Sequence, residues 1–297
     1  MENKFDLYQT VSNQIIESLE KGVVPWKCPF QSMGSGLPMN LISGKHYQGI
    51  NLLMLGLTRY ESPYWLTAKQ AFQAGGRIKK GEKASIVVFW KILETEKDGD
   101  EEKTTFRPLL RYYSVFNVQQ TTGLDHLIPK VSKPVEFNPN EACEKIVQDY
   151  VNAGGPEIRF GYTGASYSPY HDVIEMPSKD AFKSGSEFYQ TIFHEISHSA
   201  GHPKRLNRKS LVKSSTENFY SLEELVAEIS SCFLAMKSGI QPDIQNSASY
   251  IDGWLKVLKG DKKMIVFASA MAQKSVNHIL GERVEAKVEE KSFLKAA

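Results

Sequence analysis

The segment that most constrains the fold of this chain is TIFHEISHSAGH, residues 191–202. His194 and His198 are four residues apart, so a helix would place both imidazoles on one face, where a single metal ion could bind them. Glu195 would lie close enough to take a proton from a water that such an ion activates. The sequence therefore predicts a helix that carries a metal site. The apolar residues expected to anchor this helix are Ile192, Phe193 and Ile196.

A catalytic zinc site needs three protein ligands and an open fourth position. His202 is four residues past His198, but Gly201 and Pro203 break the helix there. Even in a continuous helix, His202 would lie too far from His194 to share one ion with it. We therefore expect His202 to be structural or to lie near a substrate.

Two acidic residues of SLEELVAEISSCFL are better candidates for the third ligand. Glu224 and Glu228 are four apart and share a helical face. This spacing resembles the ligand helix of glutamate zincins, in which the first acid binds the metal and the residue four later orients a histidine. We predict Glu224 as the ligand and Glu228 as the orienting residue, with Glu228 the fallback ligand. Another interpretation stays open, because Ser221 and Glu224 also have the spacing of a helix-capping box.

The donor set limits the metal and the reaction. Two imidazoles and a carboxylate suit Zn²⁺, and they also accept Mn²⁺ or another divalent ion. With Glu195 as the general base, such a site would hydrolyse a peptide bond. The expected activity is that of a zinc-dependent metallopeptidase, whose protein substrate the sequence does not identify.

The chain has 297 residues, a length that suits two domains. We expect an α+β fold with a first domain of mixed α and β structure over residues 1–130 and a second, mostly helical domain, which carries the metal site, over 138–285. The Pro- and Lys-rich segment IPKVSKPVEFNPN would link them, and residues 286–297 would form a frayed charged tail. Helices are predicted over 6–20, 49–60, 66–74, 141–152, 186–200, 222–238 and 247–280. Strands are predicted in ASIVVFWKIL, LLRYYSVFNV, EIRFGY and SPYHDVIEMP, the first two as a hairpin with the acidic run ETEKDGDEEK at its tip.

Composition excludes several classes of protein. The 41% apolar and 24% charged residues are ordinary for a globular chain. Cys28, Cys143 and Cys232 are far apart and odd in number, which fits reduced thiols in the cytoplasm better than a disulfide framework. We expect no signal peptide and no membrane span. The net charge of +2 excludes a protein that imitates DNA through a large negative charge.

Residues 59–91 combine basic and aromatic side chains in a pattern that indicates nucleic-acid binding. Positive charges can follow the phosphates of single-stranded DNA while rings stack on its unpaired bases. The glycines of GGRIKKGEK would let the backbone approach a phosphate closely. The alternative is a solvated basic face over a core filled by the aromatic rings. The predicted contact residues are Arg59, Tyr64, Trp65, Lys69, Arg77, Lys79, Lys80 and Lys83.

Segments along nearly the whole chain resemble the ArdC-type antirestriction proteins of conjugative plasmids. VPWKCPF, NLISGKHYQGINLLML, PYWLTAKQAFQAGGRIKKGEKASIVVFWK and YYSVFNVQQTTGL resemble the single-stranded-DNA-binding domain that this family shares with TraC-type plasmid primases. HDVIEMP, FYQTIFHEISHSAGHPKRLNR and EELVAEI resemble its zincin-like metallopeptidase domain. The resemblance implies a protein that protects incoming plasmid DNA from restriction. It also implies that His194 and His198 bind the metal and that Glu195 is the catalytic base.

Three functions remain open at this point. A DNA-tethered metallopeptidase would cleave a DNA-bound or restriction-related protein near the strand it holds. A DNA-occupancy protein would block restriction by binding alone, with a structural or vestigial metal site. A stand-alone peptidase would carry an unrelated N-terminal domain. Salt-sensitive binding of single-stranded DNA by residues 1–130 alone would exclude the third.

Overall fold

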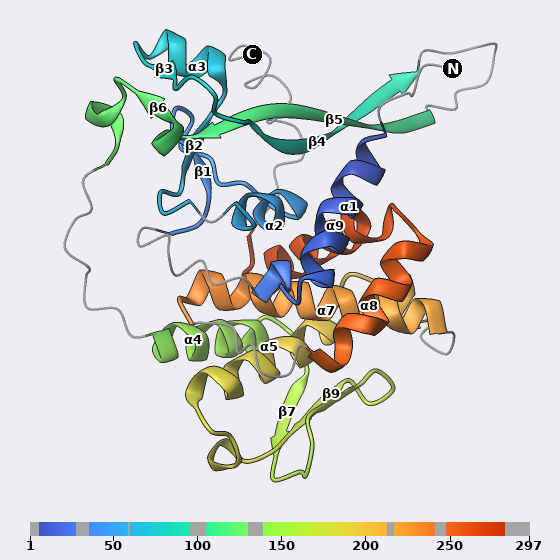
Figure 1. Cartoon of the computed structure of the whole chain (residues 1–297). Helices are drawn as coiled ribbons and strands as arrows, with labels where there is room; N and C mark the ends of the chain where they lie inside the picture. The colour runs from blue at the N-terminus through green and yellow to red at the C-terminus, as the bar shows by residue number, and fades with distance from the viewer. Residues whose placement is uncertain are drawn as a thin grey trace.

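The computed structural model describes residues 6–27, 36–58, 60–95, 105–129, 139–212, 217–240 and 248–282. Three predicted features lie outside these residues, namely the acidic tip of the hairpin, most of the linker and the charged tail. The predicted limits of the two domains therefore stay predictions. The described chain is α+β, with its longer strands in the N-terminal half and a packed group of helices in the C-terminal half (Figure 1).

The first helix, α1 (Leu7–Glu20), is confirmed. The Asp6 side chain caps it by accepting a hydrogen bond from the Gln9 N–H at 3.1 Å. Its apolar residues recur at helical spacing and form a buried face, which makes α1 part of the core rather than a surface arm. The members of that face are Leu7, Val11, Ile15 and Leu19.

A four-stranded sheet in the order β1-β2-β5-β4 organises the N-terminal half. The antiparallel pairing of β4 with β5 runs from Ser85 opposite Val115 to Thr95 opposite Thr105, which confirms the predicted hairpin. Helix α2 packs against β4, and α3 follows β2. The strands are β1 (Met39–Asn40), β2 (Tyr64–Leu66), β4 (Ser85–Thr95) and β5 (Thr105–Asn117), with a separate pair β3 (Arg77–Ile78) and β6 (Thr121–Thr122). The helices are α2 (Ile50–Gly56) and α3 (Ala68–Gln73), and the short 3-10 turns are η1 (Pro25–Lys27), η3 (Val118–Gln120) and η4 (Asp125–Leu127).

The C-terminal half is mostly helical. Helices α5, α7 and α9 pack on one another, and a three-stranded sheet in the order β7-β9-β8 flanks α5. Strand β7 is parallel to β9, and β8 is antiparallel to it. The helices are α4 (Pro139–Asn152), α5 (Gly185–Ala200), α6 (Lys209–Val212), α7 (Glu217–Ser238), α8 (Ala248–Gly260) and α9 (Met264–Ile279). The strands are β7 (Glu157–Phe160), β8 (Ser166–Ser168) and β9 (Val173–Met176), and η5 spans Lys179–Ala181.

Three sequence predictions about this half are wrong in detail. Helix α7 begins at Glu217, so Ser221 lies inside the helix and cannot cap it. The predicted helix over 247–280 is two helices, because the chain turns at Asp261–Lys263, where the Asp261 carboxylate accepts a hydrogen bond from the Lys263 N–H at 2.8 Å. The predicted strand SPYHDVIEMP is a strand only over β9, and its first part is the turn that joins β8 to β9.

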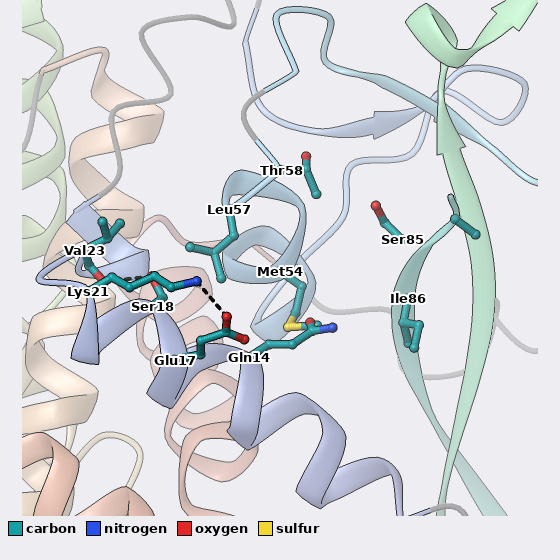
Figure 2. Close-up of a pocket in the computed structure, with 11 residues that line it drawn as sticks. Gln14, Glu17, Ser18, Lys21, Val23, Met54, Leu57, Thr58, Ser85 and Ile86 are labelled. Atoms are coloured by element: carbon teal, nitrogen blue, oxygen red, sulfur yellow. Dashed lines mark hydrogen bonds and ion pairs between the residues drawn. The ribbon is translucent and has the colours of Figure 1, made fainter. Parts of the chain in front are cut away.

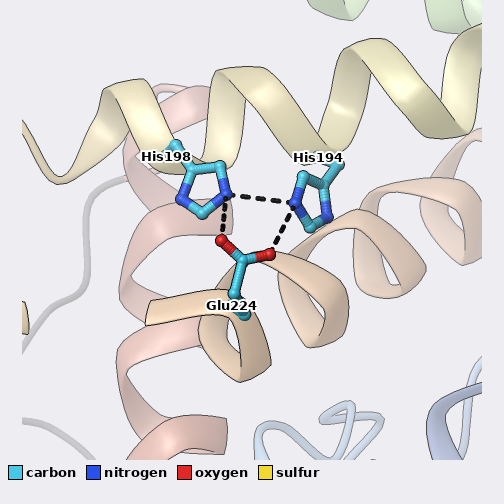
Figure 3. Close-up of side chains that lie close together, drawn as sticks. All are labelled: His194, His198 and Glu224. Atoms are coloured by element: carbon cyan, nitrogen blue, oxygen red, sulfur yellow. Dashed lines mark hydrogen bonds and ion pairs between the residues drawn. The ribbon is translucent and has the colours of Figure 1, made fainter. Parts of the chain in front are cut away.

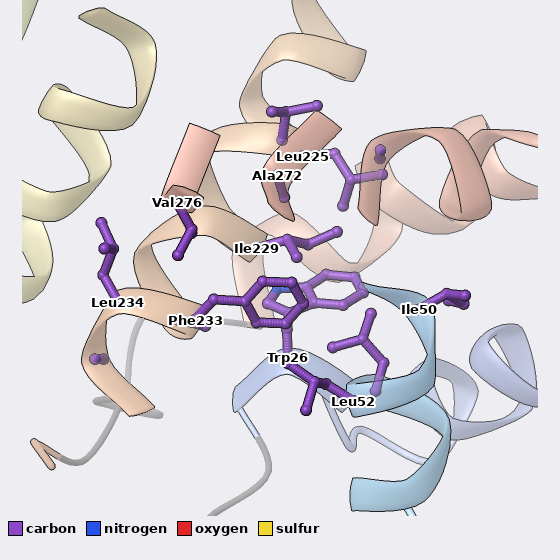
Figure 4. Close-up of a cluster of buried hydrophobic side chains, with 14 of the residues drawn as sticks. Trp26, Ile50, Leu52, Leu225, Ile229, Phe233, Leu234, Ala272 and Val276 are labelled. Atoms are coloured by element: carbon purple, nitrogen blue, oxygen red, sulfur yellow. The ribbon is translucent and has the colours of Figure 1, made fainter. Parts of the chain in front are cut away.

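The hydrophobic core joins the two halves. Its largest cluster contains residues of α1, η1 and α2 together with residues of α5, α7 and α9. Trp26 of η1 is completely buried and packs edge-on to Trp254 of α8, with ring centroids 5.0 Å apart. Figure 4 shows Trp26 among Phe233 and Ile229 of α7 and Leu52 of α2. The N-terminal half is therefore seated on the helices that build the C-terminal half.

Within the described residues, no helix is both long and apolar enough to cross a membrane.

Candidate metal centre and nucleic-acid surface

Helix α5 carries the predicted metal-binding motif of His194, Glu195 and His198, and both ends of the helix are well defined. The Ser184 hydroxyl accepts a hydrogen bond from the Glu187 N–H at 3.1 Å, and the helix ends at Gly201, as its sequence indicates. The buried side chains Phe193 and Ile196 hold its inner face in the core. The motif histidines consequently face the neighbouring helix α7.

His194, His198 and Glu224 converge at one point between α5 and α7 (Figure 3). The two Nε2 atoms of the histidines are 3.0 Å apart, and each is 3.5 Å from an oxygen of Glu224. In a tetrahedral site with bonds of about 2.1 Å, neighbouring donor atoms are about 3.4 Å apart. Glu224 Oε2 is the oxygen near His194 and Oε1 is the oxygen near His198, so the cluster is compact enough for one divalent ion. Within the described chain, these are the His, Cys, Asp and Glu residues grouped closely enough to hold an ion.

Negative charge surrounds His194. Burial by itself would lower the His194 pKa, but the hydrogen bond with Glu224 and the charges of Glu228 and Glu195 raise it to about 9. Burial would raise the Glu224 pKa, yet the hydrogen bond with His194 holds it below its usual value. Both shifts show that the pocket favours a positive charge at its centre.

Glu195 lies beside this cluster and is buried. Burial raises its pKa above the usual value, although His194 and His198 offset part of the increase. The backbone N–H of Tyr167 in β8 donates a hydrogen bond to the Glu195 carboxylate. A carboxylate with raised proton affinity in a fixed orientation suits a general base.

The contacts of the two histidines' Nδ1 atoms differ. His194 Nδ1 is 3.7 Å from Glu228 Oε1, which is too long for a hydrogen bond. His198 Nδ1 is 3.1 Å from Glu223 Oε1. Glu223 is a site residue that the sequence analysis missed. Periodicity gave no reason to pair it with Glu224, because adjacent residues point about 100° apart on a helix. The available signal in the sequence was the pair of adjacent acids, Glu223 and Glu224. The structure shows that their helix lies between α5 and α9.

His202 is buried but lies outside the cluster. Its Nδ1 accepts a hydrogen bond from the Lys204 N–H at 3.2 Å. Asp172 pairs with Arg205 and accepts a hydrogen bond from the Tyr167 hydroxyl at 2.8 Å. These contacts tie the β8–β9 turn to the end of α5.

The predicted nucleic-acid residues differ in how far their side chains are exposed. The basic side chains around α3 and β3 are exposed, whereas Tyr64 is half-buried against a small apolar cluster. Arg59 lies outside the described residues. In Figure 1, α3 and β3 lie at the top of the molecule, and α5 lies in its lower half. The exposed basic residues are Lys69, Arg77, Lys79, Lys80 and Lys83.

The prediction that Trp65 contacts DNA is wrong. Trp65 is completely buried, and its ring packs edge-on to Tyr60 with centroids 5.5 Å apart. It lies in β2 opposite Asn117 of β5, so it belongs to the core that the sheet covers. Phe72 of α3 is instead the exposed aromatic residue of this region, with 73% of its surface accessible. The basic–aromatic pattern contained Phe72, but which ring faces solvent depends on the packing of the sheet.

A cavity of about 460 Å³ lies apart from the metal cluster, between α1, α2 and β4 (Figure 2). Met54, Leu57 and Ile86 supply its apolar lining. Glu17 of α1 and Lys21, which follows α1, form an exposed ion pair that also lines the cavity. Among the described residues that line this cavity, none belongs to the metal cluster or to the predicted DNA contacts.

A helix bearing two histidines and a glutamate, facing a second helix that supplies an acidic donor, defines a zincin-like metallopeptidase domain. The family model described as a zincin-like metallopeptidase matches residues 145–271, and the model of the N-terminal domain of anti-restriction factor ArdC matches residues 5–116. Crystal structures of the antirestriction protein ArdC from plasmid R388 share 36% identity with the chain. The metal-free structure has a TM-score of 0.75 and covers 94% of this chain and 98% of its own. The Mn(II)-bound structure has a TM-score of 0.74, with coverages of 95% and 100%. The chain belongs to the ArdC antirestriction family.

Curated relatives extend this comparison. Two proteins of Escherichia coli named DNA primase TraC are 34% and 33% identical to the chain over 94% of its length. The chain spans only 27% and 20% of those two proteins. An uncharacterized protein of Sinorhizobium fredii, y4eC, is 29% identical and matches 95% of the chain and 94% of its own length. The chain is thus similar to a whole ArdC protein and to one part of a longer primase.

Proposed function

We propose that this member of the ArdC family binds single-stranded DNA and hydrolyses a protein held near that DNA, and that it thereby protects incoming plasmid DNA from restriction. The observation that carries the proposal is the convergence of His194, His198 and Glu224 beside a buried Glu195. The second support is the exposed basic and aromatic surface of α3 and β3 in the same chain. The chain matches an antirestriction protein over nearly the whole length of both proteins, and this match supports the proposed role in protection from restriction.

His194, His198 and Glu224 would hold the divalent ion. The donor set fits Zn²⁺, and the Mn(II)-bound structure of the R388 protein also makes Mn²⁺ a candidate. A bound ion would supply Lewis-acid chemistry, lowering the pKa of a water and polarising a carbonyl group. Because His194, His198 and Glu224 would supply three donors, a catalytic ion held by them would keep a further position open for such a molecule.

Glu195 would move the proton in this reaction. Its carboxylate would accept a proton from the attacking water and later deliver it to the leaving amine. Because burial raises its pKa, Glu195 holds a proton better than an exposed glutamate does. The Tyr167 N–H would keep the carboxylate oriented while the proton moves.

The Glu195→Gln variant tests the peptidase mechanism. The amide has nearly the same volume as the carboxylate but cannot accept the proton, so we expect Mn²⁺ affinity and thermal stability close to wild type. Cleavage of an unfolded protein such as casein should fall by at least about 100-fold, the low end of a general base's contribution. Cleavage at the wild-type rate would refute the role of Glu195. The control is Glu187→Gln at the exposed start of the same helix, which should cleave normally.

The same variant separates peptidase from occupancy. Transfer of a plasmid into a restricting and a non-restricting recipient should be compared for wild type and Glu195→Gln. If hydrolysis is required, the variant will lose protection. If the variant protects as well as wild type, the chain acts by occupying DNA, and the metal site is structural or vestigial.

Mobility shifts with the whole chain test the DNA surface. Phe72→Ala should weaken binding of a single-stranded oligonucleotide by about 5- to 150-fold, because stacking on one base contributes about 1–3 kcal/mol. Arg77→Ala with Lys80→Ala should instead reduce the slope of log affinity against log salt by about 1.4, or about 0.7 for each lost phosphate contact. Unchanged binding in both variants would refute this surface. The control is Tyr170→Ala, since this residue is 92% exposed in the β8–β9 turn, away from α3.

A further inference from the structure

The carboxylate of Glu223 is the most deeply buried charge next to the metal cluster, with its side chain 2% exposed. It lies on α7 directly before Glu224, and its Oε1 is 3.1 Å from His198 Nδ1. Burying a charge without partners is costly, so the surroundings must compensate it.

Three side chains enclose the Glu223 carboxylate. Arg208 donates to both of its oxygens, with Nε at 2.9 Å from Oε2 and Nη2 bonded to Oε1. The Ser210 hydroxyl of α6 donates to Oε2 at 2.6 Å. Together with His198, these donors give each oxygen two partners. A protonated carboxyl group would have to donate one of its bonds, so a carboxyl group whose two oxygens accept from Arg208 and Ser210 is ionised.

Arg208 is itself held from two other helices. Its Nη2 donates to the Ser197 carbonyl of α5 at 2.8 Å, and its Nη1 donates to the Ser275 hydroxyl of α9 at 2.6 Å. Contacts from α5, α6, α7 and α9 thus fix the carboxylate in position. Because the Glu223 carboxylate is fixed by these contacts, it can in turn orient the His198 imidazole.

The bonding partners decide the tautomer of His198. An ionised carboxylate can only accept hydrogen bonds, so the bond between Glu223 and His198 requires a proton on Nδ1. In a neutral imidazole, the lone pair then resides on Nε2. His198 Nε2 is the atom that lies 3.0 Å from His194 Nε2 and 3.5 Å from Glu224 Oε1.

We propose that Glu223, and not Glu228, is the positioning residue of the metal centre, and that it fixes His198 in the tautomer whose Nε2 lone pair faces the ion. The expected consequence is tighter metal binding, and this consequence rests on the proposed metal site. Partners of this kind commonly change metal affinity by 10- to 100-fold. Glu228 is the natural comparison because it is an acid on the same helix whose distance to His194 Nδ1 exceeds that of a hydrogen bond.

The experiment uses the full chain in metal-free form, labelled with ¹⁵N-histidine. Two-dimensional ¹⁵N–¹H spectra report the tautomer of each imidazole, and the His198 signals are those that disappear in His198→Ala. Wild type and Glu228→Gln should show His198 with its proton on Nδ1. Glu223→Gln should show a mixture of tautomers, because an amide can either accept from or donate to Nδ1. A wild-type tautomer in Glu223→Gln would overturn the proposal.

Mn²⁺ titration by calorimetry gives the second readout. Glu223→Gln should bind Mn²⁺ 10- to 100-fold more weakly than wild type, and Glu228→Gln, which removes a nearby charge without breaking a hydrogen bond to His194, should weaken binding less than Glu223→Gln does. A larger loss in Glu228→Gln than in Glu223→Gln would overturn the proposal. If wild type does not bind Mn²⁺ or Zn²⁺ at all, the proposed function fails, while the tautomer spectra still decide the role of Glu223.

A second variant addresses folding. Glu223→Gln leaves the Arg208 charge without its partner, which can destabilise the protein. The double variant Glu223→Gln with Arg208→Met removes both charges, so no buried ion stays uncompensated. It should also show mixed His198 tautomers, and a His198 fixed with its proton on Nδ1 would contradict the proposal as clearly as in the single variant.

Discussion

At the scale of single residues, close packing around Arg208 leaves little freedom at the end of α5. A Cβ added to Gly201 would lie 2.8 Å from the Arg208 Cζ and Nη2 atoms. The Gly201 backbone has an ordinary helical conformation, with φ −76°, so the restriction is one of space rather than of backbone geometry. Gly201 therefore leaves room for the guanidinium group that encloses Glu223.

Gly201→Ala should push the Arg208 guanidinium out of its place. We expect a loss of about 1–3 kcal/mol in the free energy of unfolding, the usual cost of overpacking a buried site. Mn²⁺ affinity should fall as well, because Arg208 holds Glu223. Urea unfolding and calorimetry measure the two effects. Gly164→Ala is the matched control, since a Cβ there would meet no atom within 4 Å. Equal stability of both variants would contradict this packing argument.

At the scale of elements, the β8–β9 turn joins the small sheet to the helix that bears the metal ligands. Arg205, which follows α5, pairs with Asp172 in the turn and donates to the Ser199 carbonyl at 2.7 Å. Asp172 has a positive φ of 54°, a conformation that aspartate and asparagine tolerate better than most residues. The pairing holds β8 beside α5, and β8 supplies the N–H that bonds to Glu195.

Asp172→Asn keeps the backbone preference but removes the charge that Arg205 pairs with. We expect a loss of about 1–3 kcal/mol in the free energy of unfolding at pH 7. Burial would raise the Asp172 pKa, but the bonds with Arg205 and Tyr167 lower it below 3.8. The charge therefore stabilises the fold above pH 3.8, and this contribution is lost as the pH falls through the lowered pKa.

The difference between wild type and Asp172→Asn should accordingly shrink on acidification. Urea midpoints at pH 7 and pH 3 measure it. A constant difference at both values would show that the charge of Asp172 is not the cause. Asp149→Asn removes the charge of an exposed helical ion pair and should change stability by less than about 0.5 kcal/mol.

At the scale of the whole molecule, the two halves share one hydrophobic core. Helix α1 packs on α8 and α9, and η1 packs on α7. The Gly49 N–H at the start of α2 donates to the Gln273 side chain of α9 at 3.0 Å. An N-terminal fragment would expose the face that these helices cover, including Trp26.

A fragment ending at residue 129 should therefore not fold as a stable unit. We expect no cooperative thermal transition by circular dichroism and a red-shifted tryptophan fluorescence, whereas the full chain should melt cooperatively. In the full chain, Trp26→Ala should cost about 3–5 kcal/mol, the range for truncating a large buried aromatic residue. A fragment that melts cooperatively would contradict the shared core, and DNA-binding tests would then be possible on the fragment as well as on the whole chain.

The residue pattern alone was enough to predict the local features of this protein, which are helix faces, helix ends and strands. The spacing of His194 and His198 fixed their common face, because a helix repeats every 3.6 residues. Gly201 and Pro203 predicted where α5 ends. β-Branched and aromatic residues predicted the two strands of the long hairpin, β4 and β5. Each of these features depends on neighbours within a few residues along the chain.

Contacts between side chains that are far apart in the chain depend on how the helices and strands pack, and the sequence did not predict the following ones. Nothing in the sequence indicated that Trp65 is buried while Phe72 is exposed, since that depends on which face the sheet covers. The partner of His198 is Glu223 rather than Glu228, because α7 is buried on more than one face and its crossing with α5 selects the acid that reaches Nδ1. The common core of the two halves arises in the same way, since burial depends on the packing of elements far apart in the chain.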